Sequence, residues 1–279
     1  MNEIKQTLIP SEKRCIVLTA IGDKYKTQFK QREPMFRNYA KHCNAELVLI
    51  TEPPDPLGKN NLMMQRLLLP ARFAAFDLVL LLDLDVLIPD NLPDIFAELA
   101  PDKALAAVVD PRGTHEFMQA WAYADPAIES HEQYYARKGF DLSTAIPGCR
   151  LFSINGGILL MRTAPLGPVF QALYHTTHQY NEECVMGWET QNRNLFQALP
   201  DFYNVQVTYA IHLQRFAKAR KEYYRPWVRM IRIVKRTIGR PNPHFGYGKA
   251  YAVLVATLLE ENKLVHFAGN YPIPELAHK

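Results

Sequence analysis

The sequence predicts an α/β fold built around a mixed, mostly parallel central sheet. Two observations lead to this prediction. Apolar runs of strand length alternate with segments of helical pattern over the first 110 residues, which is the order expected of a parallel sheet. Each run is long enough for one buried strand and too short to span a membrane.

Strand and helix segments follow one another regularly in the N-terminal part. The expected strands are residues 15–20, 46–50, 78–85 and 104–109, and the expected helices are residues 23–42, 61–76 and 91–99. Gly22 and Asp23 end the first strand. Residues 52–56 form a loop because their prolines cannot donate to a ladder or a helix. Pro70 should start, kink or split the helix that contains it.

The signals weaken after Asp110. Residues 112–150 are rich in His, Tyr and Ala and carry few strand signals. A further strand is expected over residues 152–161, where the adjacent Gly156 and Gly157 suggest close backbone approach to a ligand. The remaining expected elements are helices over residues 164–180 and 187–199 and a last strand over residues 263–267.

Two carboxylates lie at the end of the apolar strand 78–85. Asp83 and Asp85 are two residues apart, so in an extended strand they point the same way and can approach one ion. Unpaired carboxylates are costly to bury, so this strand end needs a cation or hydrogen-bond donors. In open α/β sheets ligands collect at the carboxyl ends of strands. The pair therefore indicates a cation site, the alternative being two solvated residues that open a loop.

Composition places the chain among ordinary globular proteins. Its 279 residues suffice for one large domain or two modest ones, and 48% are hydrophobic and 22% charged. The four cysteines are scattered, which argues against a zinc site or a disulfide framework and fits reduced thiols in the cytosol. Residues 1–10 lack the apolar core of a signal peptide, and no apolar run is long enough for a transmembrane helix. We therefore expect a cytoplasmic protein.

Positive charge is concentrated in residues 214–240. This segment holds ten Lys and Arg residues and one acid, Glu222, whereas the whole chain has a net charge of +4. At helical spacing its second half puts aromatic and aliphatic residues on one side and cations on the other. Such a helix can lie on an anionic membrane surface, which here would be the inner face of the cytoplasmic membrane; the alternative is a core-packed helix with a solvated basic face. Nucleic acid is not expected, because no binding motif accompanies the segment.

Four sequence blocks, in this order, resemble nucleotide-sugar glycosyltransferases of the GT-A type, with the family 8-like group and its bacterial relatives as the nearest likeness. The blocks are VLTA at 17–20, LLDLDVLIPDNL at 81–92, SINGGILLM at 153–161 and VHFAG at 265–269. A fifth, weaker block is WETQ at 188–191 with Asn194. The resemblance implies a Rossmann-like GT-A domain with helices on both faces of the sheet, formed by residues 1–213 and 241–279, with 214–240 as an added basic segment.

The same resemblance implies an activity and a set of site residues. It implies transfer of a sugar from a nucleoside-diphosphate sugar, most often a UDP-sugar, with Mn²⁺ or Mg²⁺ as cofactor and with retention at the anomeric carbon. The acceptor would be a glycan or a lipid-linked precursor, as in cell-surface polysaccharide or lipopolysaccharide synthesis. The implied metal ligands are Asp83, Asp85 and His266.

The remaining implied residues would contact the donor. The nucleoside and the diphosphate would be held by Thr19, Ala20, Gly22, Arg66, Asp83 and Gly269, with Arg66 offering its fork of donors to the diphosphate or ribose. The sugar pocket and the reacting carbon would be approached by Asn155, Glu189 and Gln191.

The chain departs from the family pattern in two of these blocks. The Lys and Trp that often follow the late His-Phe-x-Gly are replaced by Asn270, Tyr271 and Pro272, and Thr190 replaces an aspartate that commonly precedes the glutamine.

Two other function classes are compatible with parts of the sequence. Haloacid-dehalogenase-like phosphatases end a strand in Asp-x-Asp, but near the chain start and before a small hydroxyl residue, whereas Val86 and Leu87 follow here. A catalytically inactive glycan-binding or membrane-docked module on the same fold is the non-enzymatic alternative. Both aspartates and the late histidine argue against it.

Overall fold

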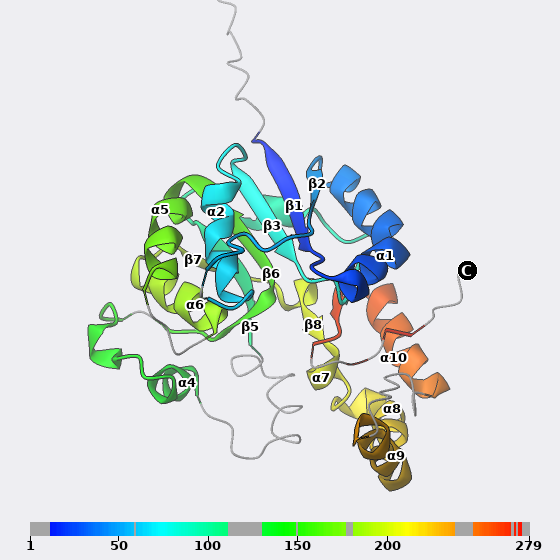
Figure 1. Cartoon of the computed structure of the whole chain (residues 1–279). Coiled ribbons are helices and arrows are strands. Elements are labelled where there is room, and N and C mark those ends of the chain that lie inside the picture. The colour runs from blue at the N-terminus through cyan, green and yellow to red at the C-terminus, as the bar shows by residue number, and fades with distance from the viewer. Residues whose placement is uncertain are drawn as a thin grey trace, which may run out of the picture.

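The structure, a computed structural model, describes residues 12–58, 60–110, 130–148, 150–176, 181–237, 248–268, 271 and 273–274. Helices cover both faces of a six-stranded central sheet, with α1 on one side and α2, α5 and α6 on the other (Figure 1). A second, three-stranded sheet and the helices α7 to α10 follow below it in this view.

The central sheet is mixed and mostly parallel, as predicted. Only β6 runs against its neighbours β3 and β5, and the other paired strands are parallel. In spatial order the strands are β2 (Glu46–Ile50), β1 (Arg14–Thr19), β3 (Leu78–Leu82), β6 (Ile154–Arg162), β5 (Leu105–Val109) and β7 (Phe196–Leu199). Five strands therefore direct their carboxyl ends to one edge, where Asp83 follows β3.

The helices differ widely in length. The α-helices are α1 (Asp23–His42), α2 (Leu69–Arg72), α4 (His131–Arg137), α5 (Thr163–Tyr174), α6 (Glu182–Asn192), α7 (Val207–Ala210), α8 (Ala217–Tyr223), α9 (Pro226–Thr237) and α10 (Lys249–Glu260). Short 3₁₀ helices span Met64–Leu68, Ile95–Glu98, Leu142–Thr144, Asp201–Tyr203 and Gln214–Phe216.

Alternate side chains of each central strand enter two different cores. On β3, Leu80 packs in the core beneath α1, whereas Val79 and Leu81 pack in the core beneath α2 and α5. This follows from the two-residue period of a strand, which sends neighbouring side chains to opposite faces. An apolar strand without polar interruption, such as Leu78–Leu82, is therefore what a doubly covered sheet requires.

The second sheet connects the end of the chain to the central sheet. It consists of β4 (Val86–Leu87), β9 (Val265–His266) and β8 (Val205–Gln206), with β9 in the middle. A separate apolar core beneath it contains residues of α7, α8 and α10, among them Ala210 and Leu254. This core anchors the C-terminal strand next to the end of β3.

Several predicted elements need correction. Residues 187–199, predicted as one helix, hold the end of α6 and the strand β7. Asn194 has a positive φ of 54°, and the amide of Leu195 donates to the Thr190 carbonyl at 2.8 Å, which ends the helix. The next residues pair in parallel with β5 and become an edge strand, because the sheet offers them a ladder.

The helix predicted over residues 61–76 is also different. It is a 3₁₀ helix followed by the single turn α2, with Pro70 in the first turn of α2. Residues 91–99 form only the 3₁₀ helix Ile95–Glu98, which Asp94 caps by accepting from the Phe96 amide. The predicted helix 164–180 ends at Tyr174, and the strand predicted over 263–267 is limited to two residues of β9.

Two further findings concern membrane-spanning helices and the cysteines. None of the helices in the described ranges is long and apolar enough to cross a membrane. Cys15, Cys43 and Cys184 are buried free thiols, and Cys149 lies outside the described residues.

The central position of β3 predicts a large stability cost for truncation there. Leu80→Ala removes a fully buried side chain and should lower the free energy of unfolding by about 2–5 kcal/mol, measured by urea denaturation. Leu57→Ala is the matched control, since Leu57 is 96% exposed. Equal losses in both variants would contradict the assigned core.

Candidate functional site

Three side chains with metal-binding atoms meet at the carboxyl end of β3. One ligand atom from each of Asp83, Asp85 and His266 can be chosen so that all lie within 4.8 Å of one another. The His266 Nε2 atom is 3.4 Å from Asp85 Oδ1 and 3.9 Å from Asp83 Oδ2. The structure thus brings together the three residues that the sequence suggested as metal ligands.

Backbone pairing sets this geometry. The Asp83 amide donates to the Gly157 carbonyl at 2.8 Å, and the Phe267 amide donates to the Asp85 carbonyl at 2.9 Å. Val86 pairs directly with His266 in the antiparallel ladder of β4 and β9. A segment near the end of the chain is therefore held in register beside the two aspartates.

A chain of amides orients the His266 ring. His266 Nδ1 lies 2.9 Å from Asn204 Oδ1, and Asn204 Nδ2 donates to Asn155 Oδ1 at 2.9 Å. The same Asn155 oxygen accepts from the Gly157 amide at 3.0 Å. In this network Nδ1 carries a proton and donates to Asn204, so that Nε2 is the ring nitrogen directed at the two carboxylates. An outer amide that fixes the tautomer is typical of histidine metal ligands.

The two glycines of β6 are explained by this crowding. A Cβ atom at Gly157 would lie 2.3 Å from the His266 Cε1 atom. At Gly156 it would lie 3.0 Å from Glu183 Oε2 and 3.1 Å from Glu182 Oε1. A side chain at Gly157 would collide with the imidazole, and Gly156 has little room, because polar side chains of the site pack against the backbone there.

Arg66 holds the other side of Asp83. Its Nη2 pairs with Asp83 Oδ1, while Nη1 donates to the Gly156 carbonyl at 2.9 Å and to Glu182 Oε1 at 3.1 Å. The guanidinium is 11% exposed. Arg66 was expected to meet a ligand, and here its fork is bonded to three groups of the protein.

The two aspartates have pKa values shifted in opposite directions. Burial raises the pKa of Asp83, and the positive charge of Arg66 and then of His266 only partly opposes it. Burial also acts to raise the pKa of Asp85, but the hydrogen bond and charge of His266, with a contribution from Arg32, hold it below its usual range. Cationic partners thus keep Asp85 ionised.

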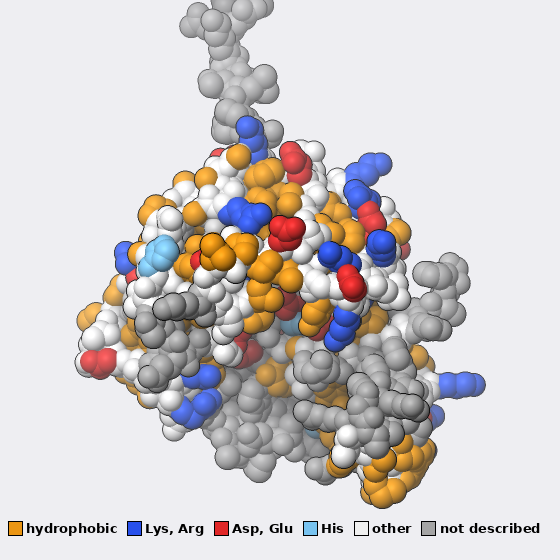
Figure 2. All heavy atoms as spheres, viewed as in Figure 1, with side chains coloured by type: hydrophobic (Ala, Val, Ile, Leu, Met, Phe, Trp, Pro, Cys, Tyr) orange, Lys and Arg blue, Asp and Glu red, His pale blue; other side chains and the backbone are white. Residues whose placement is uncertain are grey.

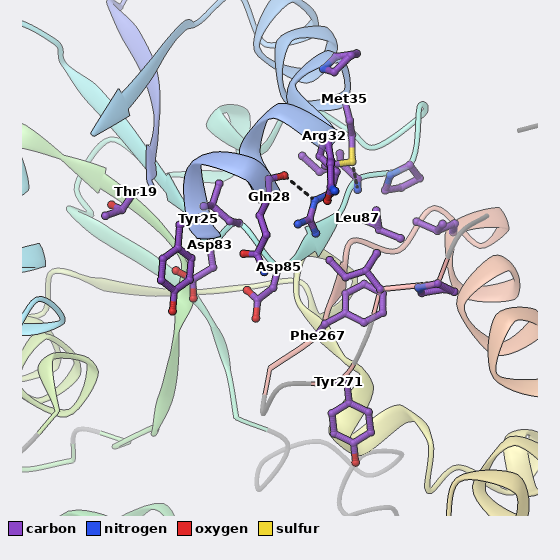
Figure 3. Close-up of a pocket in the computed structure, with 18 of the residues that line it drawn as sticks. Thr19, Tyr25, Gln28, Arg32, Met35, Asp83, Asp85, Leu87, Phe267 and Tyr271 are labelled. Carbon is purple, nitrogen blue, oxygen red and sulfur yellow. Dashed lines mark hydrogen bonds between the residues drawn. The ribbon is translucent and has the colours of Figure 1, made fainter. Parts of the chain in front are cut away.

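A cavity of about 2070 Å³ opens over this cluster. It runs from the end of β1 along α1 to α10, and Figure 3 shows Asp83 and Asp85 facing it beneath Tyr25 and Gln28. Thr19 and Arg66 line it, as does Ile21. Ala20 is fully buried beside it, and Gly22 precedes α1 with a φ of 89°, a conformation that favours glycine.

Gln191 and Glu189 lie away from the described lining of the cavity. The Gln191 amide nitrogen donates to the carbonyls of Phe152 and Gly187, and the side chain is almost fully buried. Glu189 pairs with Arg193 one turn along α6. Their suggested place near the reacting carbon stays a prediction. Gly269 lies outside the described residues.

Two acids that the sequence reading passed over lie at the site. Glu182 is fully buried against Arg66, and Glu183 is beside it at the start of α6. Burial, then the charges of Glu182 and Asp110, raises the pKa of Glu183 to about 7. Two acids in a first helical turn are an ordinary N-terminal preference. Because the helix was expected to begin five residues later, the sequence offered no signal for them.

Sequence comparisons found no relative: no protein-family model and no curated protein matches the chain. Solved structures do match. The bifunctional glycosyltransferase WbbM aligns over 94% of this chain and 46% of its own, so this chain spans about half of it, at 13% identity and a TM-score of 0.50. A glycosyltransferase involved in glycosylation of the major capsid of PBCV-1 aligns over 91% of this chain and 93% of its own, at 12% identity and a TM-score of 0.47.

GlyE of Streptococcus pneumoniae is similar over 95% of this chain and 57% of its own, at 15% identity and a TM-score of 0.46. At such identities the likeness concerns the fold alone. The architecture of a mostly parallel sheet covered by helices is the GT-A glycosyltransferase fold, as predicted.

The raised pKa of Glu183 predicts a pH-dependent effect of its replacement. The native state holds the Glu183 proton more tightly than the unfolded chain, so the free energy of unfolding falls as pH rises from about 4.5 to about 7. Glu183→Gln removes this loss. The difference in free energy of unfolding between the variant and the wild type should therefore be about 2 kcal/mol more favourable to the variant at pH 8 than at pH 5.

The measurement is urea denaturation at both pH values with a chelator present. Glu189→Gln, on the same helix but paired with Arg193, is the matched control. A Glu183→Gln variant with the same stability difference from wild type at both pH values would contradict the assignment.

Proposed function

We propose that this protein is a metal-dependent glycosyltransferase that moves a sugar from a nucleoside-diphosphate sugar, with UDP-sugars as the first candidates, to a glycan or lipid-linked acceptor. One observation carries the proposal. Asp83 and Asp85, which meet His266, line a large cavity at the carboxyl edge of a GT-A sheet. Open α/β sheets bind their ligands at this edge.

The donor set suits a divalent cation. Two carboxylates and an imidazole are hard and borderline ligands that fit Mn²⁺, and Mg²⁺ is compatible with the carboxylates. When bound, such a cation supplies charge that stabilises a departing diphosphate. The hydrogen bond from His266 to Asn204 supports this assignment, because it leaves Nε2 facing the two carboxylates, where a metal would take the place of the Nε2 proton.

The protein's own groups would hold the rest of the donor. Thr19, Ala20 and Gly22 are proposed to contact the nucleoside, since Thr19 ends β1 and lines the cavity, and the other two follow it in the chain. Asn155 is proposed to edge the sugar pocket, and the resemblance also assigns roles there to Glu189 and Gln191. Glu182 and Glu183 are additional candidates, because their carboxylates crowd Gly156. Retention at the anomeric carbon is the stereochemistry that the resemblance implies.

The test is a donor screen. Release of nucleotide from UDP-, GDP- and CMP-sugars would be measured with Mn²⁺ and then with chelator. We expect turnover of at least one donor, abolished by the chelator. Turnover of a generic aryl phosphate with no release from any nucleotide sugar would favour a phosphatase instead. Donor binding without turnover, with in-cell function intact in Asp83→Asn, would favour an inactive binding module.

A pair of glycine variants tests the metal geometry within the same screen. Gly157→Ala would push a methyl group into the His266 ring, so we expect metal-dependent release to fall by about tenfold or more. Gly167→Ala is the control, because its added Cβ meets Ala71 only at 3.6 Å, an ordinary contact. Equal activity in the two variants would argue against His266 as a ligand.

We also propose that the basic segment 214–240 contacts an anionic membrane surface, at the inner face of the cytoplasmic membrane. Trp227, Met230, Ile233 and Val234 are all more than half exposed on α9. Figure 2 shows hydrophobic side chains gathered over this helix at the lower right of the molecule. Cations interleave with them in the sequence. An apolar face with neighbouring cations suits a membrane interface and a lipid-linked acceptor.

Vesicle sedimentation tests this contact. Replacing Trp227, Met230 and Ile233 together with Ser should lower binding to vesicles that contain phosphatidylglycerol by about tenfold, because the apolar face is lost. Val253→Ser, which removes an exposed apolar side chain of α10, is the control. Charge reversal of Arg229, Arg232, Lys235 and Arg236 to Glu should have the same effect as the triple variant. Unchanged sedimentation of both would remove the membrane proposal.

A further inference from the structure

Arg32 lines the cavity, and the protein offers its guanidinium few hydrogen-bond partners. Helix α1 presents Tyr25, Gln28, Arg32 and Met35 to the cavity from one face (Figure 3). Successive residues in this set are three, four and three positions apart, so they form one stripe along a single face of the helix. The stripe passes above Asp85 and reaches Leu87, so Arg32 lies beyond the metal cluster along the cavity.

The protein uses few of the hydrogen-bond donors of Arg32. Its Nε donates to the Gln28 carbonyl within the same helix, at a long 3.3 Å. Its Nη1 is buried and has no hydrogen-bond partner. A buried cationic donor without an acceptor is costly, so native proteins rarely leave one without a ligand or water to pair with it.

The contrast with Arg66 is informative. Both arginines line the cavity, but Arg66 pairs with Asp83, Glu182 and the Gly156 carbonyl. Among the described residues, Arg32 forms no ion pair within 4.0 Å. The charge that acts on its pKa is that of Asp85, which raises it. Asp85 itself is directed to His266. Of these two guanidinium groups, that of Arg32 is the one that keeps donors for a ligand.

The surroundings of Arg32 restrict the kind of ligand. Burial lowers the pKa of Arg32, and Asp85 opposes that fall, but an arginine remains cationic. The cavity wall on the side of α10 is apolar, formed by Ala252, Ala256 and Leu259, with Glu260 at its end. A cation facing such a wall favours an anionic oxygen group over a neutral sugar hydroxyl, since arginine pairs best with carboxylate and phosphate.

We propose that Arg32 binds a phosphate or carboxylate oxygen of a substrate, on the α1 side of the Asp83, Asp85 and His266 cluster. The source of that group rests on the proposed function. It is either the diphosphate of the donor or an acidic group on the acceptor, and these share the same chemistry at a guanidinium.

The first experiment observes Arg32 directly in the wild-type protein. The Nε–H signals of ¹⁵N-labelled arginines would be recorded by NMR, and Arg32 identified by the signal missing in Arg32→Lys. Mg²⁺ with UDP probes the donor source. Glycerol 3-phosphate and glucuronate, added separately, are the simplest phosphate and carboxylate probes of the acceptor source. We expect the Arg32 signal to shift with at least one of the three.

The second experiment measures affinity in variants by calorimetry. Arg32→Gln should weaken binding of the probe that shifts the signal by about tenfold or more, and Arg32→Lys by less, because the charge remains without the fork. Arg37→Gln is the matched control on the same helix, since Arg37 is exposed and paired with Glu33. Thermal unfolding of each variant verifies that it is folded.

The outcomes are distinct. A shift with Mg²⁺ and UDP together with weaker UDP binding in Arg32→Gln assigns the donor diphosphate. A shift only with glycerol 3-phosphate or glucuronate assigns the ligand group to the acceptor. That assignment stands even if no nucleotide sugar is turned over. The proposal is overturned if no probe shifts the Arg32 signal, or if Arg37→Gln loses as much probe affinity as Arg32→Gln. This holds even where Mg²⁺-dependent UDP binding and turnover are intact.

Discussion

The balance of charge around Arg66 is the constraint on which the site depends. Asp83 and Glu182 are carboxylates from distant parts of the chain, and both bind this one guanidinium. Burying two such acids together without a cation would be prohibitive. Arg66 also donates to the Gly156 carbonyl, so one side chain joins the end of β3, the strand β6 and the start of α6. Arg66 and Asp83, which line the cavity, are thereby joined to two further elements of separate sequence.

A second constraint acts on the opposite side of the aspartates. The ladder between β4 and β9 carries His266 to Asp85, and the Asn204 and Asn155 amides fix its ring. The residues that orient the imidazole come from β6 and from the segment before β8, which belongs to the second sheet. The two sheets are therefore coupled through the candidate metal site, and the C-terminal core of α7, α8 and α10 contributes to function by supporting β9.

Much of the central sheet could be predicted because its strands are apolar runs of the right length. The strands β1, β2 and β5 lie within one residue of their predicted bounds, whereas β3 ends at Leu82, three residues before the predicted end of its strand. Asp83 and Asp85 were expected to share a direction as residues of this strand, but they lie in the bend between β3 and β4, and both approach His266 from there. The edge strand β7 could not be predicted, because Phe196–Leu199 looks like the end of an amphipathic helix until β5 offers it hydrogen bonds.

The sequence by itself determined the fold class, the aspartate pair and the concentration of basic residues in 214–240, since these depend on local pattern and composition. Only the tertiary structure decided which polar groups share a site. Glu183 lies beside Gly156, Asn204 binds His266, and Arg32 keeps an unpaired Nη1, and no local rule anticipates these facts. They depend on contacts between residues far apart in the chain, whose partners and burial are set only when the two sheets and α1 come together.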